Sequence, residues 1–158
     1  MAHLALKSKL EADVEIQAPP EQFFHMLVSY KLRDVQHTCN DKIQRCDLQQ
    51  GEWGKVGTII DWSYVHDGET KVAKDVIEVM DPDKHLITFG VIEGDVLKEH
   101  KSFSLSLQAS PKIGGGGSIV HLTLEYERLH DGIAHPETLL QLLADLTKDI
   151  DAHLPQPN

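Results

Sequence analysis

The sequence is short of positive charge and of long apolar runs. Lys and Arg number 15 against 25 Asp and Glu, which leaves a net charge of −10 over 158 residues. This balance argues against binding to nucleic acid or to anionic lipid, because both kinds of recognition rely on basic side chains that neutralise phosphates. No stretch approaches the roughly 20 apolar residues of a membrane-spanning helix. We therefore expect no nucleic-acid partner and no stable membrane insertion.

Cysteine is also scarce, with Cys39 and Cys46 as the only two. We interpret both as part of one strand, where seven residues at about 3.3 Å each place them roughly 23 Å apart, too far for a disulfide. Two reduced thiols suit a reducing compartment. Residues 1–7 contain no apolar stretch of signal-peptide length. We expect a cytoplasmic protein that is a monomer, with a weak dimer as the alternative.

Motifs for phosphate, metal and cofactor binding are missing too. Gly51, Gly54 and Gly57 form a glycine-rich loop, but it lacks the Gly-Lys-Ser/Thr ending of a phosphate-binding loop. The cysteines form no C-x-x-C pair, and the ten histidines include no H-x-x-x-H spacing. Histidines at predicted turns, such as His66 and His85, are expected to be solvated. We therefore predict no metal and no cofactor.

Period-two alternation of apolar and polar residues dominates what is present, and it predicts β-strands. The hydrophobic share of 41% suffices for the core of one domain, which we expect to span residues 1–158. Pro19 and Pro20 favour the start of a short helix, and a second is expected over 30–38. A long amphipathic helix begins near His135 and runs to about His153. The expected strands cover residues 8–16, 42–48, 56–64, 71–80, 85–92, 98–109 and 118–127.

This order of elements predicts an α+β fold in which a seven-stranded, curved antiparallel sheet surrounds one long C-terminal helix. The two short helices fall between the first and second strands. A single helix leaves space uncovered on the concave face of so large a sheet. We expect the remainder to be an internal cavity that holds a ligand.

Several motifs make the sequence resemble a known plant family. They lie at residues 51–57 (Gly-Glu-Trp-Gly-Lys-Val-Gly), 62–68, 91–95 and 124–127, and in the run from Leu129 to Thr138. The chain resembles the major latex proteins, a branch of the birch-pollen-allergen or pathogenesis-related class 10 superfamily. This resemblance implies a helix-grip (START-like) fold. It also implies an apolar cavity that binds sterols, other lipids or hydrophobic plant metabolites. Some members of the superfamily are enzymes that cyclise or isomerise reactive alkaloid or terpenoid intermediates.

Candidate ligand contacts come from the predicted inward faces. Trp62 and Tyr64 alternate with Asp61 and Ser63, so the aromatic rings should face inward. Side chains of the first short helix should plug one mouth of the cavity, or else simply pack the helix on the sheet. Leu122 stands where the family often has Trp, which would enlarge the cavity locally. The predicted ligand-binding set is Phe23, Phe24, Met26, Leu27, Trp62, Tyr64, Phe89, Phe103, Leu122, Leu139, Leu142, Leu143 and Leu146.

Two functions remain open, together with a defence protein whose cavity is incidental. The first is a binding protein that carries or stores a hydrophobic small molecule, for transport, storage or defence. The second is a cofactor-free cyclase or isomerase acting on a reactive monoterpenoid (iridoid-type) or alkaloid intermediate. Its candidate catalytic residues are His37, His100, Tyr64 and Asp75. Asp75 either faces inward, as a carboxylate near this point can in the superfamily, or faces solvent beside Lys74. Bulges can reverse the phase of a strand, so the pattern leaves both orientations open.

Overall fold

The computed structural model describes residues 6–155 and contains one sheet, one long helix and several short ones. The strands are β1 (Lys7–Ile16), β2 (Ile43–Gln50), β3 (Ile59–His66), β4 (Glu69–Asp81), β5 (Leu86–Gly94), β6 (His100–Pro111) and β7 (Ser118–Arg128). The α-helices are α1 (Pro20–Leu27), α2 (Val35–Thr38) and α3 (Glu137–His153), and the 3₁₀ helices are η1 (Tyr30–Asp34) and η2 (Asp95–Lys98). No helix in this part of the chain is long and apolar enough to cross a membrane.

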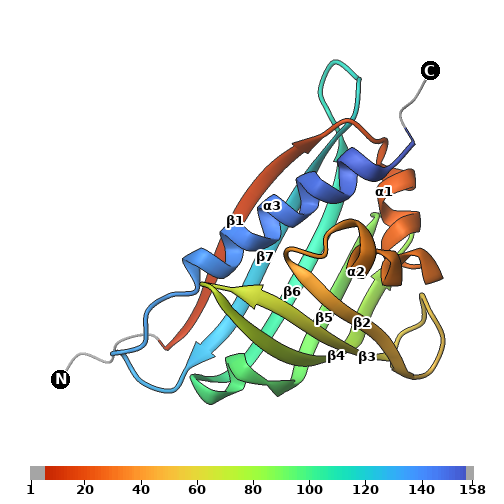
Figure 1. The fold of residues 1–158 in the computed structure, drawn as a ribbon. Helices are drawn as coiled ribbons and strands as arrows, with labels where there is room; N and C mark the ends of the chain where they lie inside the picture. Colours follow the sequence, from red (N-terminus) through yellow and green to blue (C-terminus); the bar gives the residue numbers. More distant parts are fainter. Residues whose placement is uncertain (1–5, 156–158) are drawn as a thin grey trace.

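The seven strands form one antiparallel sheet in the order β1-β7-β6-β5-β4-β3-β2. Figure 1 shows the sheet curving around α3, with α1 and α2 near the C-terminal end of that helix. The predicted architecture is therefore confirmed: a curved sheet, a long C-terminal helix, and short helices between the first two strands.

The long helix α3 is held against the sheet by its apolar stripe and by one carboxylate. Leu139 and Ile150 are buried on the inner side, at the spacing that the sequence predicted. Near the C-terminal end, Asp151 accepts hydrogen bonds from the backbone N–H groups of Gln17 and Ala18, at 2.9 and 3.0 Å. These two bonds join the last turns of α3 to the chain just after β1.

One half of the sheet is closely packed. On β7 the inward residues Val120 and Leu122 are completely buried, and β1 places Val14 and Ala12 directly beside them. α3 packs chiefly against β1, as Figure 1 shows. Here the strict alternation of the sequence corresponds to a filled core.

Two expectations about local structure are wrong. Val56 lies in a loop with its side chain 60% exposed, because β3 begins only at Ile59. The loop turns through glycines with positive φ. At Gly54 a β-carbon would clash with the carbonyl oxygen of Val28, so this loop packs against the end of α1. Cys39 does not share a strand with Cys46. It ends α2, where its N–H donates to the carbonyl of Val35 at 2.8 Å, and both cysteines are buried and free.

His66 and His85 are not solvated, contrary to expectation. The side chain of His66 is only 13% exposed, since it bonds Thr138 Oγ1 at 2.8 Å and Lys71 Nζ at 3.1 Å. His85 is half-buried, with its ring edge-on to Phe24 at 5.7 Å between centroids. Turn position alone did not reveal these contacts, because their partners come from distant segments.

Candidate functional site

An apolar cavity of about 130 Å³ lies between the sheet and α3. A cavity of roughly 150 Å³ holds one benzene molecule, so this space has the size of one small organic molecule. Its wall is formed by Leu27, Leu32, Val35, Ile43, Trp62, Tyr64, Ala73, Asp75, Phe89, Val91, Val96, Phe103, Leu105, Leu107, Leu124, Leu139, Leu142, Leu143, Leu146, Thr147 and Ile150.

Most of the predicted ligand-binding residues lie on this wall. They come from α1, β3, β5, β6 and α3, which the fold brings around one space: Leu27, Trp62, Tyr64, Phe89, Phe103, Leu139, Leu142, Leu143 and Leu146. Their contact with a ligand stays a prediction. The geometry is that of a small-molecule site, with apolar walls and a few polar groups.

Four predicted contacts lie elsewhere. Phe23, Phe24 and Met26 are buried in the core but are absent from the wall, so their placement matches plain packing of α1 on the sheet. Leu122 is also absent from the wall. It is completely buried on the inner face of β7 between Val120 and Leu124, and of these three residues Leu124 lines the cavity. Leu122 therefore faces inward without lining the cavity, and the expected local enlargement stays a prediction.

The sequence reasoning missed several wall residues. Leu105 and Leu107 alternate with serines on β6, so the strand pattern could have identified them. Leu32 and Val35 come from η1 and α2, short irregular segments in which no period shows which side faces inward. Ile43 begins β2 and completes the wall beside them.

Asp75 on β4 brings a carboxyl group into this apolar wall. Its neighbour Lys74 lies on the other face and pairs with Glu93 at 3.3 Å, so the inward orientation of Asp75 is the one the structure has. The pairing with β5 shifts register between Lys74 and Asp75. An irregularity of this kind is why the sequence pattern left the orientation of Asp75 open. Atom Oδ1 of Asp75 is buried without a hydrogen-bond partner among the described residues, and burial raises the pKa of the carboxyl to about 7.

Two residues of β3, Trp62 and Tyr64, bring further polar atoms to this wall. The indole Nε1 of Trp62 is buried and has no hydrogen-bond partner among residues 6–155, and its ring lies edge-on to Phe89 at 6.5 Å. Burial, followed by the nearby charges of Asp95 and Asp75, raises the pKa of Tyr64 to about 12. The phenol is therefore un-ionised at neutral pH and available as a hydrogen-bond donor.

The two histidines proposed for catalysis lie outside the cavity. His37 is exposed on α2. His100 is buried at the start of β6, where Nδ1 bonds the carbonyl of Val96 at 2.8 Å and the ring packs edge-on against Phe103 and Tyr126. Neither ring joins Tyr64 and Asp75 on the wall. No cluster of three or more metal-ligating side chains occurs within the described part of the chain.

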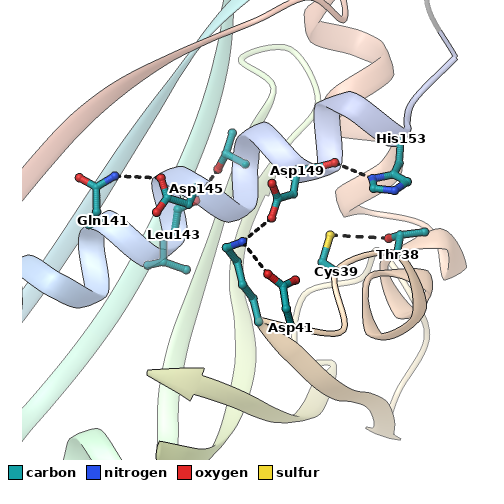
Figure 2. Close-up of polar contacts among 10 residues, drawn as sticks. Thr38, Cys39, Asp41, Gln141, Leu143, Asp145, Asp149 and His153 are labelled. Atoms are coloured by element: carbon teal, nitrogen blue, oxygen red, sulfur yellow. Dashed lines mark hydrogen bonds and ion pairs between the residues drawn. The ribbon is translucent and has the colours of Figure 1, made fainter. Parts of the chain in front are cut away.

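A salt bridge crosses the seam between α3 and the segment that follows α2, as Figure 2 shows. Lys42 Nζ lies 2.6 Å from Asp149 Oδ2 on α3 and 3.1 Å from Asp41 Oδ2. The neighbouring residue Ile43 lines the cavity, as does Ile150 next to Asp149, so the bridge lies along the cavity's edge. Cys39 is close by, but burial raises the pKa of its thiol, which leaves it a poor nucleophile.

The chain is similar to major latex-like proteins of several plants. It is 55% identical to MLP-like protein 28 of Arabidopsis thaliana over 95% of this chain and 44% of that relative. With MLP-like protein 43 of the same plant it shares 50% identity over 95% of this chain and 94% of the relative. It thus spans less than half of the first relative and nearly all of the second. The crystal structure of major latex-like protein 151 from Panax ginseng matches with a TM-score of 0.89 at 32% identity, covering 95% of this chain and 99% of that one. The model of the pathogenesis-related protein Bet v 1 family matches residues 5–156, and the chain belongs to that family.

Proposed function

We propose that this protein binds a hydrophobic small molecule in the cavity between the sheet and α3, for transport, storage or defence. The observation that supports it is the apolar wall around an unfilled space of about 130 Å³. Protein interiors are normally packed without voids of this size, because each void forfeits contact energy. A bound apolar molecule would restore those contacts. Its transfer from water into the cavity would also be favourable through the hydrophobic effect.

Equilibrium binding to a panel of sterols, fatty acids, flavonoids and terpenoids tests this function. We expect at least one class to bind with a Kd below about 100 µM, roughly 5.4 kcal/mol. The variant Ala73→Phe places a ring into the cavity and should weaken that binding. Ala152→Phe is the matched control, since Ala152 is exposed at the end of α3. Absence of binding by every panel member, or equal binding by Ala73→Phe, would refute the proposal.

A second candidate is a cofactor-free cyclase or isomerase of a reactive monoterpenoid or alkaloid intermediate. The observation that favours it is a carboxyl group with a pKa of about 7, Asp75, on the same apolar wall as the phenol of Tyr64. An acid or base whose pKa lies near the working pH is suited to proton transfer. Incubation of a reactive enol intermediate with and without the protein tests this function through the ratio of products. A changed product ratio that Asp75→Asn abolishes supports catalysis, and an unchanged ratio excludes it.

A further inference from the structure

Two buried polar atoms without partners lie on neighbouring positions of the cavity wall. Trp62 on β3 pairs with Ala73 on β4, and Asp75 is two residues further along the same inward face of β4. Residues in this diagonal relation have their β-carbons about 7 Å apart, within reach of long side chains. The indole Nε1 of Trp62 and the Oδ1 of Asp75 therefore belong to one polar region, here called the polar pole of the cavity.

The polar pole contains the two buried polar atoms of the wall that have no hydrogen-bond partner among the described residues. Neither Trp62 Nε1 nor Asp75 Oδ1 has a partner among the described residues. Elsewhere on the wall, by contrast, the hydroxyl of Thr147 donates to the carbonyl of Leu143 at 2.8 Å. Leaving buried polar atoms unpaired is unfavourable, so a ligand that pairs both atoms gains affinity over one that pairs neither.

We propose that the ligand is a neutral apolar molecule bearing a hydroxyl group, which accepts a hydrogen bond from Trp62 Nε1 and donates one to Asp75 Oδ1. This inference rests on the proposed binding function and specifies the ligand's chemistry. A hydroxyl has one donor and two acceptor sites, so it can serve both atoms at once. A hydrocarbon pairs neither atom, and an ammonium group has nothing for the indole N–H. A carbonyl group can accept from the indole, but it can pair with Asp75 only while that carboxyl is protonated, whereas a hydroxyl pairs with either form of Asp75.

The charge and the volume of the cavity restrict the class of ligand further. No Lys, Arg or His is among the described residues that line the cavity, so nothing there neutralises a carboxylate ligand, and an ionised Asp75 would repel one. Fatty acids are therefore disfavoured. A cavity of about 130 Å³ is close to the roughly 150 Å³ that holds one benzene molecule, so a small terpenoid alcohol fits it better than a sterol. Geraniol is a suitable probe.

The test compares geraniol with 2,6-dimethylocta-2,6-diene, which has the same carbon skeleton without the hydroxyl. We measure both Kd values by calorimetry for the wild type, Asp75→Leu, Asp75→Asn and Trp62→Phe. The ratio of hydrocarbon Kd to alcohol Kd cancels what each variant does to apolar packing. We expect this ratio to fall about tenfold in Asp75→Leu and in Trp62→Phe, the size of effect of one hydrogen bond. In Asp75→Asn the amide still accepts and donates, so the ratio should stay near the wild-type value.

Asp47→Leu is the matched control, because Asp47 is an exposed carboxylate on the neighbouring strand β2 and its removal should leave the ratio unchanged. Asp75→Leu removes a desolvated acid, so it should fold, and Trp62→Phe tests the same pole independently. If both probes bind and the ratio is the same in all variants, the hydroxyl inference is overturned while the binding function stands. Tighter binding of geranylamine than of geraniol, lost in Asp75→Asn, overturns it in favour of a cationic ligand. If neither these probes nor any panel member binds, the binding function fails together with the inference.

Discussion

The inner face of the sheet differs between its two halves. Along β7, beside β1, Val120 and Leu122 are completely buried and form part of a filled core. Along β3 and β4, Trp62, Tyr64 and Asp75 border an open cavity. Apolar and polar residues alternate along the strands of both halves. The inward residues are closely packed in one half and border the cavity in the other. α3 packs chiefly against β1, and its first turn also reaches the end of β3, where Thr138 bonds His66.

This contrast separates what stabilises the fold from what is available to a ligand. In the filled half, truncating Leu122, which is completely buried and does not line the cavity, creates a new void. In the hollow half the void already exists, and Trp62 Nε1 and Asp75 Oδ1 there have no hydrogen-bond partner among residues 6–155. Substitutions matched across the two halves should therefore have different consequences.

The largest effect is expected for Leu122→Ala. Truncating a completely buried leucine removes its transfer energy and leaves a cavity, which together destabilise by about 2–5 kcal/mol. Leu142→Ala on α3 should destabilise by at least about 1 kcal/mol less, since Leu142 is only partly buried and already faces the cavity. Urea unfolding of both variants gives the comparison, and equal losses would contradict the division into filled and hollow halves.

The next effect concerns pH and Asp75. Its pKa is about 7 in the folded protein against about 3.9 in an unfolded chain, so the folded state holds this proton more tightly. Between pH 4 and 7 the unfolded state releases the proton first. Stability from this group is therefore present below pH 4 and is lost as pH rises to about 7, on the order of 4 kcal/mol in total.

Asp75→Asn should abolish that dependence. The difference in unfolding free energy between the variant and the wild type then grows in favour of the variant from pH 4.5 to pH 8. Taking the difference cancels the titration of every other group. A difference that stays constant with pH would show that the carboxyl of Asp75 is not desolvated in the folded protein.

A smaller loss is expected at the end of α3. Asp151→Ala removes the acceptor of two backbone N–H groups, those of Gln17 and Ala18, and should destabilise by about 2–3 kcal/mol. Asp145→Ala, which removes a surface bond to Gln141, should stay within about 0.5 kcal/mol. Thermal and urea unfolding measure the stability of both variants. Comparable losses of unfolding free energy would show that the Asp151 hydrogen bonds do not stabilise the attachment of α3.

The smallest effect on stability is expected for Lys42→Met at the edge of the hollow half. The bridge from Lys42 to Asp149 is partly exposed, so its loss should change stability by less than about 1 kcal/mol. It should instead speed the dissociation of a bound probe, because the salt bridge shown in Figure 2 is lost next to Ile43 and Ile150 of the cavity wall. Stopped-flow displacement measures the rate, with exposed Lys148→Met as the control. Equal rates in the two variants would show that the seam is not the ligand's path.

Sequence periodicity predicted the strands well where pairing is regular. The alternation of Val120, Leu122, Leu124 and Tyr126 corresponds to their burial on β7. Predictions failed where distant segments decide the environment. His66 lies at a turn but is covered by contact with Thr138, 72 positions away in the sequence. The orientation of Asp75 stayed open because a register shift beside it interrupts the regular phase.

The sequence by itself determined the order of elements, the curved sheet with its single long helix, and the inward orientation of Trp62 and Tyr64. These follow from local patterns of two and 3.6 residues, which need no knowledge of distant contacts. Only the tertiary structure decided that Leu122 fills the core, that His37 and His100 lie outside the cavity, and that Asp75 and Trp62 both lie on its wall. The physical reason is that burial and hydrogen-bond pairing depend on what α3 covers. That coverage is a property of the packed molecule, and no single strand encodes it.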